Sequence, residues 1–275
     1  MNESPTRQPD GRGGGPAMHR TAIGPVWVEL RRRFGEGRQA VGADAWRSWI
    51  RLMAAGVAGL LLLMVGLMLT AQWVLAAGWL DWEAGFLRWL GESGPLGFAS
   101  GVFFQTFATD ITLVILVGAT AGIAAWARRP ITALSIIMAP AVVDLTGRFG
   151  WLLWHRVRPD VLYDGVASPG LHSFPSGHTS KATATYGLLV LIWVAASRSV
   201  IERTSAILLL LLIVVLVPLG RMTMGVHWPS DIAGGFILGA AWLAVLRVGL
   251  RYENDPYTAR SRSGASPDNT ARVAR

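Results

Sequence analysis

Six long runs of apolar residues constrain this chain more than any other feature of its sequence. A helix of about 20 apolar residues is long enough to cross the hydrocarbon core of a bilayer. The runs lie approximately at 50–71, 102–127, 131–154, 177–196, 206–219 and 232–250. Backbone polar groups inside a bilayer must be satisfied within the spanning segment, so these runs are expected to be helices rather than strands. The predicted fold is therefore an all-α, polytopic bundle of six transmembrane helices.

The composition agrees with a membrane protein. Of the 275 residues, 52% are apolar and only 15% are charged, whereas soluble domains contain about 25% charged residues. The net charge of +8 would also suit a nucleic-acid binder, but such a protein carries its basic residues as a patch on one face. Here many arginines adjoin the apolar runs instead, so no nucleic-acid partner is predicted. The absence of cysteine excludes disulfides and thiolate chemistry.

Polar sequence rich in glycine and arginine precedes the apolar region, and a short polar segment follows it. We predict a disordered basic N-terminal tail at 1–45, a six-helix membrane domain at 46–251 and a disordered C-terminal tail at 252–275. An amphipathic stretch at 26–34 could lie on a membrane surface, although a solvated tail is the favoured interpretation. The segment 78–97, which contains several tryptophans, is expected to form an interfacial helix along the headgroups.

The arginines that flank the apolar runs predict the orientation of the bundle. With six crossings, four arginine-containing segments fall on one side of the membrane: 31–51, 128–129, 198–203 and 247–262. The positive-inside rule makes that side cytoplasmic, together with both termini. The plasma membrane is the expected location. Three arginines on the opposite side break the rule and need another explanation, and these are Arg156, Arg158 and Arg221.

Three polar clusters interrupt the apolar sequence, and the lengths between them predict that they meet at the outer membrane face. The clusters are His-Arg-Val-Arg-Pro at 155–159, Ser-Phe-Pro-Ser-Gly-His at 173–178, and the segment 220–231 with Gly-Arg and Gly-Val-His-Trp-Pro-Ser-Asp. About 40 residues separate the second cluster from the third, enough for one crossing and its return. A loop of about 16 residues keeps the first cluster on the same side.

The residue types in these clusters are suited to binding phosphate. The guanidinium groups of Arg158 and Arg221 can form paired hydrogen bonds to phosphate oxygens and stay charged at any working pH. Pro175, Ser176 and Gly177 open a helix, whose free backbone N–H groups and positive dipole end can hold an anion. The glycine allows the backbone to approach the anion closely.

Two histidines and one aspartate in the clusters can carry the chemistry. His227 and Asp231 are four residues apart at the start of the last helix. The carboxylate can accept a proton from one imidazole nitrogen and leave the other nitrogen free to attack phosphorus. His178 can then protonate the departing alkoxide. Phosphoryl transfer needs mainly positioning and charge stabilisation, which this set supplies without a metal or other cofactor.

The three clusters resemble the three motifs of the type 2 phosphatidic acid phosphatase superfamily: Arg158-Pro159, Pro175-Ser176-Gly177-His178, and Arg221 followed by His227-Trp228-Pro229-Ser230-Asp231. The resemblance covers roughly residues 50–250. It implies a six-helix membrane fold in which His227 is the nucleophile, Asp231 orients it and His178 is the general acid. It also implies a set of phosphate ligands: Arg158, Arg221 and the backbone at Ser176 and Gly177.

One position departs from the family pattern. The first motif usually begins with a lysine seven residues before Arg158, and this position is Trp151. Tryptophan cannot bind phosphate as an ammonium group does. Arg148, one helical turn earlier, and Arg156, in the following loop, are the candidate phosphate ligands that would replace the lysine. Because Asp144 lies four residues before Arg148, an intrahelical ion pair is an equally good interpretation of that arginine.

The predicted function is hydrolysis of a lipid phosphomonoester or pyrophosphate through a phosphohistidine at the outer membrane face. Candidate substrates are phosphatidic acid, phosphatidylglycerol phosphate and polyprenyl phosphates or pyrophosphates. One alternative is a phosphotransferase that passes the phosphoryl group from His227 to an acceptor hydroxyl. Another, motivated by Trp151, is a catalytically weakened relative that binds or transports lipid phosphates. The expected partners are the lipid phosphate and the bilayer.

Overall fold

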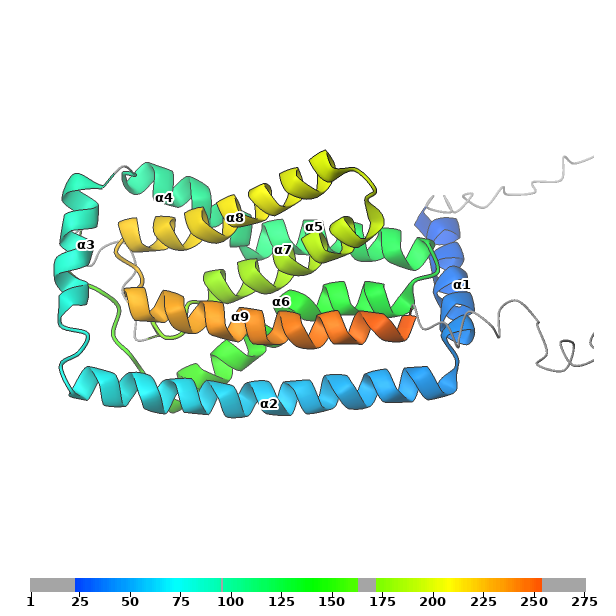
Figure 1. The fold of residues 1–275 in the computed structure, drawn as a ribbon, viewed down its shortest axis with the longest axis horizontal. Coiled ribbons are helices and arrows are strands. Elements are labelled where there is room, and N and C mark those ends of the chain that lie inside the picture. Colours follow the sequence, from blue (N-terminus) through cyan, green and yellow to red (C-terminus); the bar gives the residue numbers. More distant parts are fainter. Residues whose placement is uncertain (1–22, 95, 163–171, 254–275) are drawn as a thin grey trace, which may run out of the picture.

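The computed structural model describes residues 23–94, 96–162 and 172–253. Within them, six helical segments are long and apolar enough to cross a membrane: Ala43–Ala76, Phe98–Trp126, Pro130–Leu153, Gly177–Ala196, Val200–Thr223 and Pro229–Glu253. In Figure 1 these segments run along one direction as a bundle. The predicted all-α bundle of a multi-pass membrane protein is therefore confirmed.

The crossings correspond to the following helices: α2 (Ala43–Ala76), α4 (Phe98–Gln105) with η1 (Thr106–Ala108) and α5 (Asp110–Trp126), α6 (Pro130–Leu153), α7 (Gly177–Ala196), α8 (Val200–Thr223), and α9 (Pro229–Gly249) with η3 (Leu250–Glu253). The second crossing is interrupted rather than continuous. Thr109 has an extended backbone (φ −72°, ψ 154°) and precedes the first residue of α5. The fifth crossing is longer than expected, because the Ser199 side chain accepts a hydrogen bond from the Glu202 N–H and caps α8 there.

Two further helices lie across the ends of the bundle (Figure 1). The helix α3 (Trp82–Ser93) confirms the helix expected within 78–97. The helix α1 (Ile23–Val41) corrects the predicted disorder for its part of the segment 1–45. Val26, Trp27 and Val28 are exposed, so the solvated stretch at 26–34 stays a prediction. Residues 1–22 and 254–275 lie outside the described residues, so the remainder of both predicted tails stays a prediction.

The helix α1 is held by contacts that its own sequence does not reveal. Arg128, in the turn between α5 and α6, donates a 2.6 Å hydrogen bond to Glu36. The guanidinium of Arg33 lies 4.4 Å from the ring centroid of Trp126, the last residue of α5. Partners about 90 residues away therefore dock α1 on the bundle, which explains why a local reading of this segment favoured disorder.

The helices α7 and α9 lie side by side, and glycines of α9 allow a close approach (Figure 1). A Cβ atom at Gly235 would lie 2.7 Å from the carbonyl oxygen of Ser176, and one at Gly239 would lie 2.8 Å from that of Ser180. Any side chain at either position would push the two helices apart. The start of α7 is consequently held against the start of α9, where the second and third polar clusters lie.

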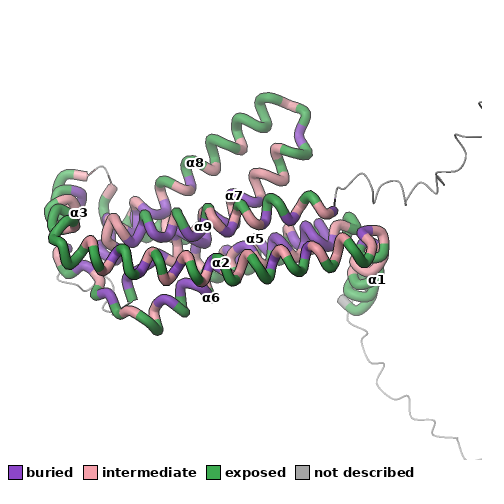
Figure 2. Tube along the Cα trace, turned by 60° about the horizontal axis from the view of Figure 1, so that its bottom comes forward, coloured by how far each residue is buried: buried purple, intermediate pink, exposed green. Residues whose placement is uncertain are grey.

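Burial is distributed as expected for a bundle surrounded by lipid. Buried residues line α6, α7 and α9, whereas α8 is exposed along most of its length (Figure 2). The exposed side chains of α8 are large and apolar, for example Leu208, Leu212 and Val215. On a soluble protein such an apolar surface would indicate an association site. On a helix that spans a membrane, apolar side chains are expected to contact the acyl chains of the lipids.

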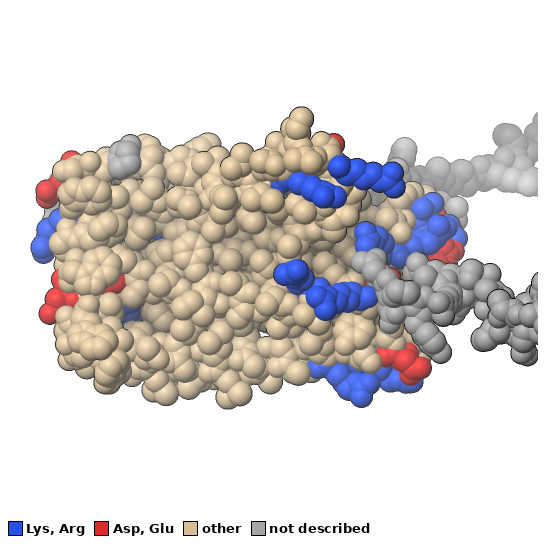
Figure 3. All heavy atoms as spheres, viewed as in Figure 1, with Lys and Arg blue, Asp and Glu red and all other residues tan. Residues whose placement is uncertain are grey.

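Charged side chains gather at the two ends of the bundle. On the face that Figure 3 shows, lysine and arginine side chains concentrate at the end where α1 lies, and a broad band without charge separates them from the opposite end. This band agrees with a segment that sits in the hydrocarbon core.

Candidate active site

The three polar clusters meet at the end of the bundle where α3 lies. Gly177 opens α7 and Pro229 opens α9 at this end, while α6 and α8 end there. His178 lies within electrostatic range of Arg158, Arg221 and His227. The structure therefore brings together residues from all three clusters, as the lengths between them predicted.

A tight turn carries His227 to the start of α9. The helix α8 ends at Thr223, and Gly225 follows in the left-handed region with φ +67°. That conformation strains an L-residue, and a Cβ atom at Gly225 would also lie 3.0 Å from the Cβ of Leu162. Pro229 then occupies the first turn of α9, where its missing N–H costs nothing.

His227 and Asp231 are both buried, with 2% and 0% exposure. The imidazole Nδ1 lies 3.5 Å from Oδ2 of Asp231, longer than a normal hydrogen bond, so a small rotation of the ring is needed to form one. Burial lowers the pKa of His227 to about 4, with partial compensation from the Asp231 carboxylate. The imidazole is therefore neutral near pH 7, the state that its predicted role as a nucleophile requires.

The Asp231 carboxylate is fixed by several donors. Its Oδ2 accepts a 2.8 Å hydrogen bond from the backbone N–H of Trp228 and a short one from the hydroxyl of Ser173. Its Oδ1 accepts a 2.6 Å bond from Nη1 of Arg156. These bonds leave the carboxylate one orientation relative to His227, which is what an orienting partner requires.

Arg156 and Glu83 form a buried charged network behind Asp231. Arg156 donates a 2.8 Å hydrogen bond from Nη2 to Glu83, and its Nη1 also reaches Ser230 at 2.7 Å. Glu83, which lies on α3, accepts a 2.6 Å bond from the backbone N–H of Ser230 in the first turn of α9. The guanidinium of Arg156 is thus directed at Asp231 and Glu83, in contrast to its predicted use as a phosphate ligand.

Sequence reasoning missed Glu83, which lies 73 residues before Arg156 in a segment read only as interfacial. One signal could have drawn attention to it. Arg156 lies on the side of the membrane that the positive-inside rule keeps poor in arginine. A buried arginine needs a carboxylate partner, and the segment 78–97 on the same side contains three acidic residues.

Arg158 and Arg221 are the two predicted phosphate ligands whose guanidinium groups form no carboxylate ion pair within the described part of the chain. Arg158 donates 3.3 Å hydrogen bonds to the backbone oxygens of Val226 and His172. Arg221 is buried and donates to the Gln105 side chain, a second residue that sequence reasoning missed. The Nε atom of Arg221 is buried with no hydrogen-bond partner among the described residues. Donors remain available on both arginines for a phosphate.

Ser176 and Gly177 have different roles at the N-terminus of α7: Ser176 is the capping residue and Gly177 is the first residue of the helix. The Ser176 side chain caps the helix by accepting from the Thr179 N–H at 3.4 Å, and its own N–H donates to the Asp231 carbonyl at 3.0 Å. Ser176 therefore joins α7 to α9. Beside Gly177, a Cβ would meet no atom within 4 Å. The first N–H groups of a helix have no intrahelical acceptor, and binding of an anion in this open space stays a prediction.

Arg148 and Trp151 complete the predicted set. Arg148 pairs with Asp144 at 2.7 Å, and its side chain is 58% exposed. The structure thus contains the intrahelical ion pair, and the phosphate role of Arg148 stays a prediction. Asp144 also lies 3.4 Å from Lys181, which pairs with Asp110 of α5.

Trp151 stacks on His172 with ring centroids 5.6 Å apart. The backbone carbonyl of His172 accepts a hydrogen bond from Arg158.

Comparison with known proteins agrees with these motifs. Residues 129–255 match the family model of the PAP2 superfamily. This region contains α6 to η3 and all three polar clusters. This part of the chain therefore belongs to the PAP2 superfamily, as the motifs predicted.

Several curated relatives are 33% identical to this chain. The phosphatidylglycerophosphatase B of Bacillus subtilis matches over 85 residues, 30% of this chain and 41% of the relative. The lipid phosphate phosphatase 2 of Arabidopsis thaliana matches over 122 residues, 38% of this chain and 42% of the relative. The decaprenylphosphoryl-5-phosphoribose phosphatase of Mycobacterium tuberculosis matches over 96 residues, 34% and 48%. The chain spans less than half the length of each of these relatives.

The crystal structure of Aquifex aeolicus LpxE aligns with a TM-score of 0.43 and 21% identity, covering 61% of this chain and 94% of that one.

Proposed function

We propose that this protein is a membrane lipid phosphatase that hydrolyses a phosphomonoester or pyrophosphate through a phosphohistidine at His227. One observation carries the proposal. A buried His–Asp pair, a second histidine and two arginines without carboxylate partners among the described residues lie together at one end of a membrane-spanning bundle. A lipid phosphate sits at this level of the bilayer. The names of the three curated relatives, all phosphatases of lipid-linked phosphates, support the same class.

In the first step, the free imidazole nitrogen of His227 attacks phosphorus and the bond to the leaving oxygen breaks. His178 donates the proton that the leaving oxygen needs. Arg158 and Arg221 balance the charge on the phosphoryl oxygens. In the second step, His178 takes a proton from water, and the water oxygen attacks the phosphohistidine. The products are the dephosphorylated lipid and inorganic phosphate, and the enzyme returns to its starting state.

The distribution of arginine predicts which side of the membrane the site faces. Lysine and arginine side chains gather at the end where α1 lies (Figure 3), whereas α9, which begins just after His227, starts at the other end (Figure 1). The positive-inside rule makes the arginine-rich end cytoplasmic. We accordingly propose both termini in the cytoplasm of a plasma-membrane protein, with the active site on the extracytoplasmic face. The candidate substrates are phosphatidic acid, phosphatidylglycerol phosphate and polyprenyl phosphates or pyrophosphates.

The test is phosphate release by purified protein from a panel of these lipids with EDTA present. We expect release from at least one lipid, undiminished by EDTA. No release from any lipid would overturn the phosphatase proposal, and a loss that magnesium restores would overturn the metal-independent mechanism. Product analysis with an added acceptor alcohol separates hydrolysis from transfer to a hydroxyl.

The structure supports a positioning role for Glu83. Replacing Glu83 with glutamine removes a charge from the network that holds Arg156 and the first turn of α9. We expect kcat to fall about 10- to 100-fold with little change in KM, because small displacements of catalytic groups have effects of that size. Steady-state kinetics on the purified variant measures both constants.

The matched control is Glu92→Gln, an exposed glutamate on the same helix α3. This variant is expected to behave as wild type. The positioning role would be rejected if both variants had the same kcat. A variant that unfolds is recognised by its thermal unfolding midpoint, and Arg156→Lys then provides a second test, since lysine keeps the charge but loses the forked contact to Glu83 and Asp231.

The pH dependence should reflect the burial of His227. Because burial lowers the pKa of His227 to about 4, the nucleophile is unprotonated above that pH and is lost only as the pH falls through about 4. An exposed histidine would be half protonated near pH 6.5. Titration of the histidine ring signals by NMR, with His227→Ala to assign them, measures the pKa directly. A midpoint at pH 6 or above would contradict the prediction.

A further inference from the structure

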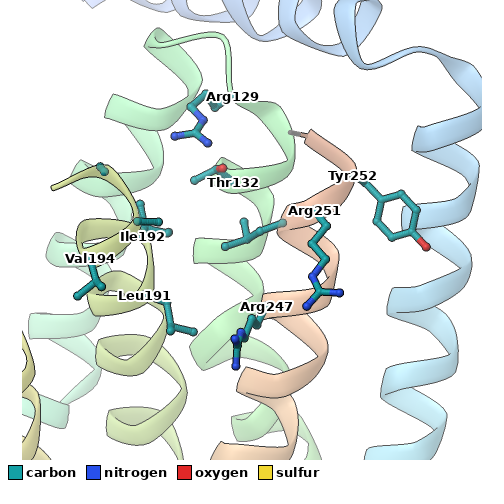
Figure 4. Close-up of a pocket in the computed structure, with 11 residues that line it drawn as sticks. Arg129, Thr132, Leu191, Ile192, Val194, Arg247, Arg251 and Tyr252 are labelled. Carbon is teal, nitrogen blue, oxygen red and sulfur yellow. The ribbon is translucent and has the colours of Figure 1, made fainter. Parts of the chain in front are cut away.

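A cavity of about 910 Å³ lies between α6, α7 and α9 at the end of the bundle opposite to His227. Three arginines from different elements line it: Arg129 before α6, Arg247 in the last turn of α9, and Arg251 in η3. Figure 4 shows Arg247 and Arg251 one above the other on the same face, with Arg129 across the opening. The remaining wall is largely apolar and comes from α7, including Leu191, Ile192 and Val194.

Arg129 is paired with Glu253, with Nε and Oε2 3.6 Å apart, so the charge that matters in this cavity comes from the other two arginines. Arg247 and Arg251 have no ion-pair partner among the residues that the structure describes. None of the lining residues is acidic. The cavity therefore complements an anion.

The apolar wall indicates that the anion carries hydrocarbon. A second cavity of about 570 Å³ shares Arg129, Thr132, Ile192 and Ala196 with the first and continues along α7. Its side chains are largely apolar, and Glu202 is the acidic residue in its lining. The arginines lie at the ends of the spanning helices, which is the level of the headgroups.

We propose that this groove binds an anionic phospholipid of the leaflet opposite to the active site. The headgroup phosphate binds Arg247 and Arg251, with Arg129 nearby, and an acyl chain lies along α7. The site is separate from the candidate active site, because α7 carries His178 in its first turn and lines the groove only with its last turns. The inference therefore stands whether or not the proposed phosphatase activity is correct.

Lipid binding to delipidated full-length protein, measured by native mass spectrometry, tests the proposal. Phosphatidylglycerol is the anionic probe and phosphatidylcholine the zwitterionic one; neither carries a phosphomonoester. We expect tighter binding of phosphatidylglycerol by wild type. In Arg247→Gln/Arg251→Gln its affinity should fall about thirtyfold, the combined effect of two arginines at a membrane surface. It should then approach that of phosphatidylcholine.

The matched control is Arg47→Gln/Arg51→Gln, which removes two arginines four residues apart near the start of α2, at the same end of the bundle. This variant should keep the preference for phosphatidylglycerol. An equal loss in both double variants, or no loss in either, would overturn the proposal. Glycerophosphoglycerol, which has the headgroup without acyl chains, should not displace the lipid at equal concentration; displacement would show a site for free phosphate esters instead. Unchanged thermal unfolding midpoints in lipid-free detergent confirm that each variant is folded.

Discussion

Replacing His227 with alanine is expected to abolish phosphate release and to lower kcat by about 10⁴-fold or more. The variant keeps the arginines and His178 but has no atom that can accept the phosphoryl group, and loss of a nucleophile has effects of this size in other enzymes. The measurement is phosphate release from the best lipid of the panel. Acid-quenched wild type incubated with a ³²P-labelled substrate should also carry label on histidine, and His227→Ala should carry none.

The control for this variant is His155→Ala. His155 is an exposed histidine of the first cluster, and no catalytic role is proposed for it. It is expected to retain both turnover and labelling. Substantial turnover by His227→Ala would show that water attacks the lipid phosphate directly or that another residue is the nucleophile, and the phosphohistidine mechanism would then be abandoned.

The second large effect is expected for His178→Ala, and it should depend on the leaving group. An alkoxide leaves poorly without a proton, so kcat for a lipid phosphate should fall about 10²- to 10⁴-fold. A nitrophenolate leaves well unprotonated, so formation of the phosphohistidine from 4-nitrophenyl phosphate should be much less affected. His178 also activates water in the second step. The variant should consequently release nitrophenol in a burst of about one equivalent and then turn over slowly.

Rapid mixing measures the burst, and acid quenching measures the accumulated phosphohistidine. Two results would contradict the role of His178 as the acid and base. One is an equal loss of the first step with both substrates, which would indicate that His178 only binds phosphate. The other is a full rate in the second step, which would assign activation of water to another group. The variant His155→Ala is again the matched control.

The predictions from sequence agree most closely with the structure where residues close in the sequence determine where a helix begins or ends. The helix α7 runs over Gly177–Ala196, the predicted range, because Ser176 supplies a cap at one end and the apolar run stops at the other. The start of α9 at Pro229 likewise follows from local chemistry. The residues that meet at the site were also predictable, because each crossing returns the chain to a known side of the membrane.

The predictions from sequence differ from the structure where contacts between distant parts of the chain determine the local conformation. The helix α1 is docked through Glu36 and Arg33 on partners in and after α5, so its own composition indicated disorder. The contacts that dock α1 lie outside the window that a periodicity argument uses. The break before Asp110 was missed for a different reason, because hydropathy does not distinguish one straight helix from two helices joined by an extended residue.

Arg156 shows most clearly what remains undetermined until the chain is folded. Its position among the predicted phosphate ligands made it a candidate to replace the family's lysine, which is absent at Trp151. Only the packing of α3 brings Glu83 within 2.8 Å, and only the close approach of α9 brings Asp231 within 2.6 Å. A buried guanidinium pairs with whichever carboxylates the fold places beside it, because an unpaired buried charge is strongly unfavourable. The sequence alone thus predicted the six crossings, the family and the residues that gather at the candidate site, whereas the tertiary structure decided which arginines have no carboxylate partner among the described residues and which one holds Asp231.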